Sequence, residues 1–345
     1  MRVLDPPPPP REAPARTRPA GAPVRRLFDK YALLLAWAVT IAIFGAIEPG
    51  IFLQAGNFAS LFSSQAVLVV LTCSLVVTLT ASEYDLSVAS VLTLTSMLIA
   101  VLNARIGMAI VPSILIAVAA GTMVGVVNAV LIVGVGIDSI IATLGTGTLV
   151  SGLALWVSNS ETISGISQSL VNAVIVPRLF GLSLGFVYAL ILTIVLWYVL
   201  SYTPVGVQLL FVGRGRRVAR LSGLAVERLR FGALVAGSLL AAGAGVLYAG
   251  TSGAADPASG ESFMLPAFAA AFLGSTSIVP GRFNAWGAFI AVYFLVTGIN
   301  GLSLMGIQIF IQDLFYGGAL IIGVTLSVLV RRRETRERDV PSGQE

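Results

Sequence analysis

The chain has 345 residues, of which 57% are hydrophobic and only 11% are charged, and its formal net charge is +5 at pH 7. A mean hydropathy of +0.94 is typical of an integral membrane protein and excludes an ordinary soluble domain. The sequence contains no His, which excludes histidine-based metal sites, catalytic triads and proton relays. We therefore predict an all-α, multi-pass membrane protein with no metal ligands and no catalytic residues of its own.

The single lysine and the single cysteine further restrict the kinds of site that the chain can form. Lys30 is the only lysine, and it stands outside any glycine-rich segment, so a phosphate-binding loop of the form GxxxxGK[ST] is absent. If the protein uses ATP, a separate subunit must hydrolyse it. Cys73 is the only cysteine and lies in an apolar run, where we expect it to pack without special chemistry.

The chain divides into two tails and one membrane domain. Residues 1–30 contain five consecutive prolines at 6–10 and several arginines, so we expect a disordered cytoplasmic tail that is not a signal peptide. We expect residues 31–330 to form a transmembrane domain and the charged residues 331–345 to form a second cytoplasmic tail.

Ten segments are apolar and long enough to cross the hydrocarbon core, which takes about 20 residues of helix. The segment 264–279 is short, and 60–81 begins with three polar residues, so either is a candidate broken or re-entrant element. The predicted spans are 31–48, 60–81, 87–103, 108–134, 138–158, 183–201, 231–250, 264–279, 285–302 and 308–330.

The basic residues give the orientation. With ten spans and a cytoplasmic N-terminus, 19 of the 21 Lys and Arg residues fall in cytoplasmic segments, and only Arg105 and Arg178 do not. This bias is what the positive-inside rule requires. The sequence thus predicts a helical membrane bundle with both termini in the cytoplasm.

Acidic side chains near the membrane are candidates for the translocation path, because such groups usually face a cavity or a partner. Glu83 and Asp85 lie between the second and third spans, and Asp313 lies near the start of the last. Asp138 is a further acidic residue, at the start of the fifth span. For Asp85 and Asp138, the alternative to a place on the path is capping of a helix N-terminus. Glu83 has no evident partner in the sequence.

Uncharged polar residues extend this candidate path along several spans. They either bond to a neighbouring helix or line a passage for a hydroxylated solute, and the pattern leaves both possibilities open. These candidates are Asn128, Thr143, Thr146, Ser275, Thr276, Asn300 and Gln312.

A basic cluster interrupts the apolar sequence in the loop 203–230. Each of its guanidinium groups would cost a few kcal/mol at the centre of a bilayer, so the loop must lie in water. We therefore expect a cytoplasmic docking surface there. The six basic residues are Arg214, Arg216, Arg217, Arg220, Arg228 and Arg230.

Four segments of the chain carry motifs of one known family, in the order in which the family has them. EYDLSVAS at 83–90 is similar to GIDLSVGS, and the segment 125–153 contains IATLGT after an Asn. The segment 203–224 ends in ARLSGL, similar to AARLSGI, and 266–287 contains LGSTS, similar to LGGTS. Over about residues 40–330 the chain thus resembles the inner-membrane permease subunits of bacterial ABC importers for monosaccharides of the ribose, xylose and galactose type.

The resemblance implies a permease dimer, of two identical or closely related copies, that binds ATPase subunits and a periplasmic sugar-binding protein. ATP and Mg²⁺ would be bound by the ATPase, and this chain would bind no cofactor and no nucleic acid. A short cytoplasmic helix would dock on the ATPase and couple its motion to the membrane helices. The matching residues are Val218, Ala219, Arg220, Leu221, Ser222 and Gly223.

The chain departs from the family pattern near these segments. Gly213-Arg214-Gly215-Arg216-Arg217 replaces a stretch that is often GGN with an acidic residue, which makes the docking loop unusually basic. Glu83 and Ala89 stand at Gly positions, Pro266 at an Asp and Asp138 at a Pro.

The expected function is import of a monosaccharide or related polyol across the membrane. Membrane lipid would surround the chain. Two alternatives remain open at this point. One is a branched-chain amino-acid permease of the ABC type, which has the same broad architecture. The other is an ion-coupled secondary transporter, in which Glu83, Asp85 and Asp313 would carry protons.

Overall fold

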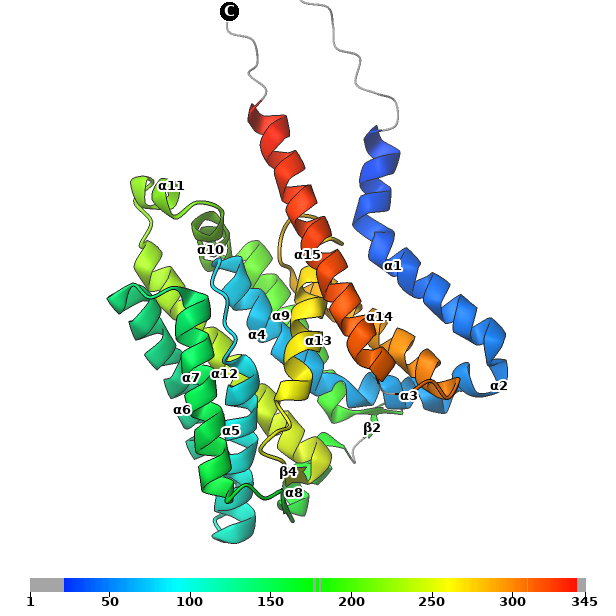
Figure 1. Cartoon of the computed structure of the whole chain (residues 1–345), viewed down its shortest axis with the longest axis vertical. Helices are drawn as coiled ribbons and strands as arrows, with labels where there is room; N and C mark the ends of the chain where they lie inside the picture. Colours follow the sequence, from blue (N-terminus) through cyan, green and yellow to red (C-terminus); the bar gives the residue numbers. More distant parts are fainter. Residues whose placement is uncertain (1–21, 176–177, 180, 309, 340–345) are drawn as a thin grey trace, which may run out of the picture.

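The computed structural model describes residues 22–175, 178–179, 181–308 and 310–339 as a helical bundle (Figure 1). The α-helices are α1 (Ala22–Ile47), α2 (Pro49–Phe52), α3 (Ala55–Ser64), α4 (Ala66–Thr80), α5 (Val88–Ala100), α6 (Ile110–Ala129), α7 (Ser139–Ser158), α8 (Gln168–Val174), α9 (Leu184–Tyr202), α10 (Pro204–Arg214), α11 (Arg216–Leu221), α12 (Val226–Ser252), α13 (Glu261–Gly274), α14 (Ala285–Leu304) and α15 (Phe310–Asp339).

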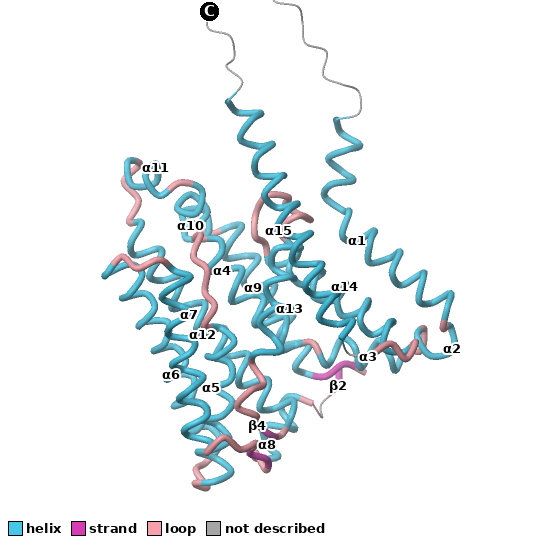
Figure 2. The backbone as a smooth tube through the Cα atoms, in the orientation of Figure 1, coloured by secondary structure: helices cyan, strands magenta, loops and turns pink. Residues whose placement is uncertain are grey.

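Two π-helical turns, Val101–Arg105 and Val130–Val135, continue α5 and α6. The short strands lie in the connections between helices (Figure 2). They form two antiparallel pairs, β1 (Ile163–Ser164) with β4 (Ala254–Ala255), and β2 (Arg178–Leu179) with β3 (Leu182–Ser183).

The count of membrane spans agrees with the prediction of about ten. Eight of the described helices are long and apolar enough to cross a bilayer, and α3 with α4 makes a ninth, bent by 44°. The predicted short span is α13, with 14 residues and Pro266 inside it. The two irregular elements are thus the two that the sequence singled out.

Two helices continue beyond their predicted spans. Helix α1 begins at Ala22, so residues 22–30 of the expected disordered tail are helical, while residues 1–21 lie outside the described part. Helix α15 runs on to Asp339 through the charged segment that we expected to be a separate tail. Arg and Glu are good helix formers, so a helix that leaves the membrane has no local reason to stop there.

The centre of the bundle is α4, in which every residue from Ala66 to Thr80 is buried. Helix α12 packs along α4, α5 and α6, and small residues allow the close approach. A Cβ atom added at Gly245 would lie 2.6 Å from the Leu92 carbonyl oxygen, and one added at Gly125 would lie 2.6 Å from the Ser238 Cβ. Cys73 is fully buried in α4, as expected.

The most basic segments gather at one end of the bundle. The N-terminal end of α1, the α10–α11 hairpin and the C-terminal end of α15 project from the same end, and α8 and β4 lie at the opposite end (Figure 1).

At that opposite end, Thr162 donates a hydrogen bond to Asp256 (2.6 Å), and the Ala258 amide donates a second one. These two hydrogen bonds lower the pKa of the Asp256 carboxyl.

Candidate functional site

The loop 203–230 folds as two short helices and the first turn of a long one. Thr203 caps α10 by accepting a hydrogen bond from the Gly206 amide (3.4 Å), and Pro204 occupies the first turn, where no amide donor is needed. Gly215 separates α10 from α11, and Gly223, with φ of +80°, ends the turn after α11. The local sequence therefore dictates a compact hairpin.

The hairpin exposes an apolar tip. Val218 is 64% exposed and Leu221 is 82% exposed, although both are large hydrophobic side chains. Ala219 is buried instead, in a small core with Val212 and Val226 that holds α11 against α10 and α12. Of the remaining predicted docking residues, Ser222 and Gly223 are exposed, and Arg220 is exposed and pairs with Glu227. Five of the six predicted residues thus lie on the surface.

Glu83 binds this loop from inside the bundle. Its side chain is 1% exposed, and Oε1 accepts hydrogen bonds from Arg216 Nη2 (2.7 Å) and from Arg230 Nε. Arg216 also donates to the Ser82 carbonyl oxygen (3.2 Å). The partners are far away in sequence, which is why sequence reasoning found none for Glu83. The one available signal was that Glu83 and Arg216 both depart from the family pattern.

Backbone contacts reinforce this junction. The Ser82 hydroxyl donates to the Gly213 carbonyl oxygen (3.0 Å), and a Cβ at Gly213 would lie 2.0 Å from the Thr80 carbonyl oxygen. Only glycine fits there, so the end of α10 rests directly on the end of α4. Ser82 has φ of +59°, an uncommon conformation for a residue with a side chain.

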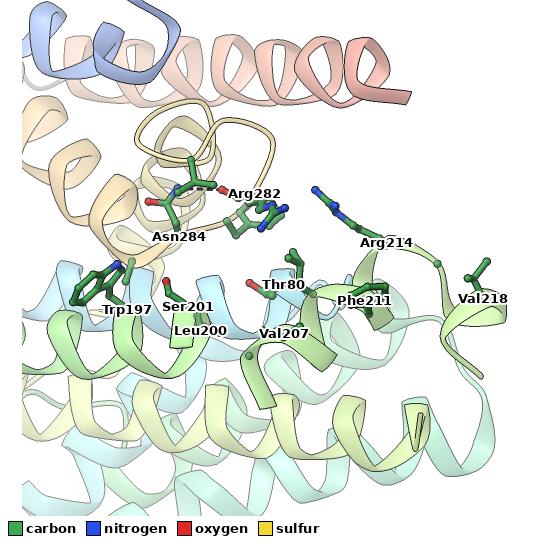
Figure 3. A pocket seen from close by; sticks show the side chains of 16 residues that line it. Thr80, Trp197, Leu200, Ser201, Val207, Phe211, Arg214, Val218, Arg282 and Asn284 are labelled. Carbon is green, nitrogen blue, oxygen red and sulfur yellow. Dashed lines mark hydrogen bonds between the residues drawn. The ribbon is translucent and has the colours of Figure 1, made fainter. Parts of the chain in front are cut away.

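A basic pocket of about 640 Å³ opens beside α10. Arg214 reaches over it from α10 and Arg282 from the connection between α13 and α14 (Figure 3). Among the described residues that line it, none is acidic. The pocket suits an acidic surface of a partner. Its lining is completed by Thr80, Trp197, Leu200, Ser201, Gly206, Val207, Leu210, Phe211, Gly215, Val218, Val279, Phe283, Asn284 and Ala285.

Several predicted path residues form a buried network that starts two residues after Glu83. Asp85 Oδ1 accepts hydrogen bonds from the Ser87 amide (2.9 Å) and hydroxyl (2.6 Å). Asn128 donates to the Ser87 hydroxyl (2.8 Å) and accepts from the Thr146 hydroxyl (2.5 Å). Asp85 and Asn128 have no exposed surface, so in this conformation a solute cannot touch them. The network joins α5, α6 and α7.

Thr143 belongs to the same region, because its hydroxyl accepts from the Leu86 amide (3.0 Å). Asp138 caps α7, as the alternative for it predicted, by accepting from the Ile140 amide (2.9 Å). The same kind of local contact occupies Asp85. For Asp85, Asn128, Thr143 and Thr146, the contacts therefore favour bonding between neighbouring helices over lining a passage.

The remaining predicted path residues lie elsewhere. Ser275 donates to the Ser327 hydroxyl (3.1 Å), and Thr276 donates to the Leu273 carbonyl oxygen (2.7 Å). Of the other three, Asn300 donates a hydrogen bond to Asn57 Oδ1 (2.9 Å), Gln312 is half-buried, and Asp313 is exposed in the first turn of α15. The ten candidates therefore do not surround one passage within a single chain.

The buried network makes a testable prediction at two neighbouring threonines of α7. Replacing Thr146 by Val leaves the Asn128 side-chain oxygen without its donor, at a cost of about 1–3 kcal/mol in unfolding free energy. Thr148→Val, at an exposed position in the same helix, should be nearly neutral. Thermal unfolding in detergent measures both. An equal stability of the two variants, with a changed KM for Thr146→Val alone, would instead place Thr146 on the path.

Comparison with known proteins agrees with this architecture. A family model described as the permease component of the branched-chain amino acid transport system matches residues 57–324. The chain is 28% identical over 309 residues to the D-allose transport system permease protein of Escherichia coli K12, covering 88% of this chain and 93% of that protein.

Other relatives cover the chain to a similar extent. An autoinducer 2 import system permease of Enterobacter sp. strain 638 is 31% identical over 310 residues (88% of this chain, 89% of that protein). The ribose import permease of Bacillus subtilis strain 168 is 29% identical over 301 residues (87% and 93%). No solved structure matches the chain significantly. The match over most of the chain, together with the helical bundle, shows that this protein belongs to the membrane permease family of ABC importers.

Proposed function

We propose that this permease subunit moves a monosaccharide or a related polyol across the bacterial inner membrane. The relatives named for D-allose and ribose support a sugar, as does the order of the four motif segments. The family model carries a branched-chain amino-acid description, so that solute class is the runner-up. An importer permease is no enzyme, and the energy must come from elsewhere.

The exposed tip of the α10–α11 hairpin indicates how ATP hydrolysis on another subunit would drive transport. Val218 and Leu221 are large apolar side chains that stand exposed on a hairpin surrounded by arginines. Exposed apolar side chains within a polar rim are the pattern of a protein interface. We infer that α11 docks on a separate ATPase, which binds ATP and Mg²⁺, and that the basic pocket beside it faces an acidic part of that subunit.

The proposed orientation places this hairpin, with both termini, in the cytoplasm. The basic ends of α1 and α15 lie at the same end as α11, which supports this orientation through the positive-inside rule. A periplasmic solute-binding protein would then meet the opposite end, where β1 pairs with β4.

A second permease copy would complete the passage. Six of the ten path candidates are buried within one chain, so a solute needs another surface, such as one between two copies; the six are Glu83, Asp85, Asn128, Thr143, Thr146 and Ser275. Helix α7 offers an apolar face with the exposed side chains Ile141, Leu149 and Trp156, which either lipid or a second copy would cover. Whether the pair is a homodimer is decided by the mass of the detergent-solubilised complex.

Transport in proteoliposomes tests the function. The permease is reconstituted with its ATPase and with the solute-binding protein, and uptake of labelled solute is followed with ATP inside. Uptake that requires both ATP and the binding protein is the expected result. Uptake driven by a proton or sodium gradient without the ATPase would contradict it and favour a secondary transporter, while a binding protein selective for leucine or valine would favour the amino-acid alternative.

A further inference from the structure

We propose that Glu83 and Arg216 form a latch that ties the docking hairpin to the membrane helices, so that Glu83 is a positioning residue for coupling. The inference rests on the proposed function, because it assumes that α11 receives the motion of an ATPase. It goes further by naming the side chains through which that motion enters the bundle.

The first argument is burial. The Glu83 side chain is only 1% exposed, and its second oxygen, Oε2, has no hydrogen-bond partner among the described residues. A carboxylate in such a place is unfavourable unless cations stay close to it. Arg216 and Arg230 supply the two positive charges. The carboxylate and the loop therefore hold each other in place.

The second argument is the placement of the two arginines. Arg216 begins α11, and Arg230 follows in the first turns of α12, so both sides of the connection 217–229 are tied to one carboxylate. A movement of α11 cannot leave Glu83 behind without breaking these bonds. The close approach of Gly213 to the Thr80 carbonyl oxygen leaves no room for α10 to move closer to the end of α4.

The third argument is what lies beyond Glu83. Two residues further on, Asp85 accepts a hydrogen bond from the Ser87 hydroxyl. The Ser87 hydroxyl accepts a hydrogen bond from Asn128 on α6, and Asn128 accepts one from Thr146 on α7. Two sets of polar contacts, joined through the backbone of residues 83–85, thus connect α11 with three membrane helices. Networks of hydrogen bonds and packed side chains of this kind carry energetic coupling between distant sites.

The two arginines have different parts in the latch. Arg230 is 12% exposed and serves as the fixed counter-charge of Glu83, whereas Arg216 is 44% exposed and reaches in from the docking hairpin. The Arg216 contact is therefore the one that a docked ATPase can make or break. Glu83 and Arg216 both stand where this chain departs from the motifs that it otherwise resembles, so the latch belongs to this chain rather than to the family pattern.

The test compares Arg216→Gln with Arg217→Gln in the full permease assembled with its ATPase and binding protein. Arg217→Gln is the matched control for loss of a positive charge from the docking loop, because the exposed Arg217 side chain makes no hydrogen bond or ion pair within the described residues and so does not tie the loop to Glu83. For Arg216→Gln we expect ATPase copurification and ATP hydrolysis within about 2-fold of the parent, and solute transported per ATP lowered by about 10-fold. Arg217→Gln should keep the parental ratio, and Arg216→Lys should recover part of it.

Hydrogen exchange gives a second readout that needs no transported solute. When the ATPase binds the unaltered permease, amide protection should change in α11 and also in residues 82–87; in Arg216→Gln the change should stay within α11. Protection changes confined to α11 in the unaltered permease would overturn the latch. So would a parental solute-to-ATP ratio in Arg216→Gln, or a loss of ATPase copurification, which would make Arg216 a docking residue.

The controls separate this inference from the proposed function. Failure of the unaltered permease to transport any solute with ATP would contradict the function, whereas the exchange experiment still decides the latch. Glu83→Gln is a supporting variant only, because removing a buried charge can reduce the amount of folded protein. Arg216 is exposed enough for its substitution to leave the fold intact.

Discussion

Replacing Leu221 by Glu is expected to abolish solute uptake without reducing the amount of permease in the membrane. Leu221 is 82% exposed at the tip of α11, so the substitution removes no contact of the core. At the centre of an interface a buried charge without a partner costs at least about 2 kcal/mol, or about 30-fold in affinity for the ATPase. Uptake and ATPase copurification measure the two effects.

Leu221→Met is the matched control for this prediction, because it preserves an apolar side chain of similar size. It should retain uptake and copurification. Arg220→Glu should also abolish uptake, but it breaks the pair with Glu227 as well, so Leu221 gives the cleaner result. Unchanged uptake and copurification in Leu221→Glu would refute the assignment of α11 as the coupling helix.

Replacing Gly245 by Ala is expected to remove most of the folded permease. The added Cβ would meet the Leu92 carbonyl oxygen at 2.6 Å and the Thr95 Cβ at 2.8 Å, so α12 must move away from α5. Overpacking of this kind costs about 1–3 kcal/mol, and here backbone atoms have to yield. The yield of monodisperse protein and its thermal midpoint in detergent measure the loss.

Gly243→Ala, two residues away in the same helix, is the control. An added Cβ there meets nothing within 4 Å, and alanine is the better helix former, so stability should be unchanged or slightly higher. If the two variants were equally stable, the close packing of α12 on α5 would not be essential to the fold.

Hydropathy predicted the spans well because the thickness of the bilayer sets the length of apolar helix that it can hold. The broken segment at 60–81 and the short one at 264–279 were recognisable from polar residues and length, and they became α3–α4 and α13. Hydropathy did not predict that residues 22–30 and 331–339 are helical, because a helix continues into water wherever the helix propensity of its residues allows.

The candidate site was predictable in part. The docking loop stood out because guanidinium groups are costly in a bilayer, and the resemblance narrowed the predicted contact to residues 218–223, among which Leu221 is exposed. The partners of Glu83 were not predictable, because Arg216 and Arg230 are brought to it only by the packing of α10 and α12 on α4. Polar residues such as Asn128 and Asn300 were grouped by type, although the fold separates them.

Helix α15 has a consequence for experiments on the assembled transporter. Its 30 residues correspond to about 45 Å of helix, longer by about 15 Å than the hydrocarbon it would cross. The C-terminal end of α15 projects from the same end of the bundle as the α10–α11 hairpin (Figure 1). If the ATPase docks on α11 as proposed, a fluorophore attached at position 339 reports its approach by energy transfer, while α11 itself stays unlabelled.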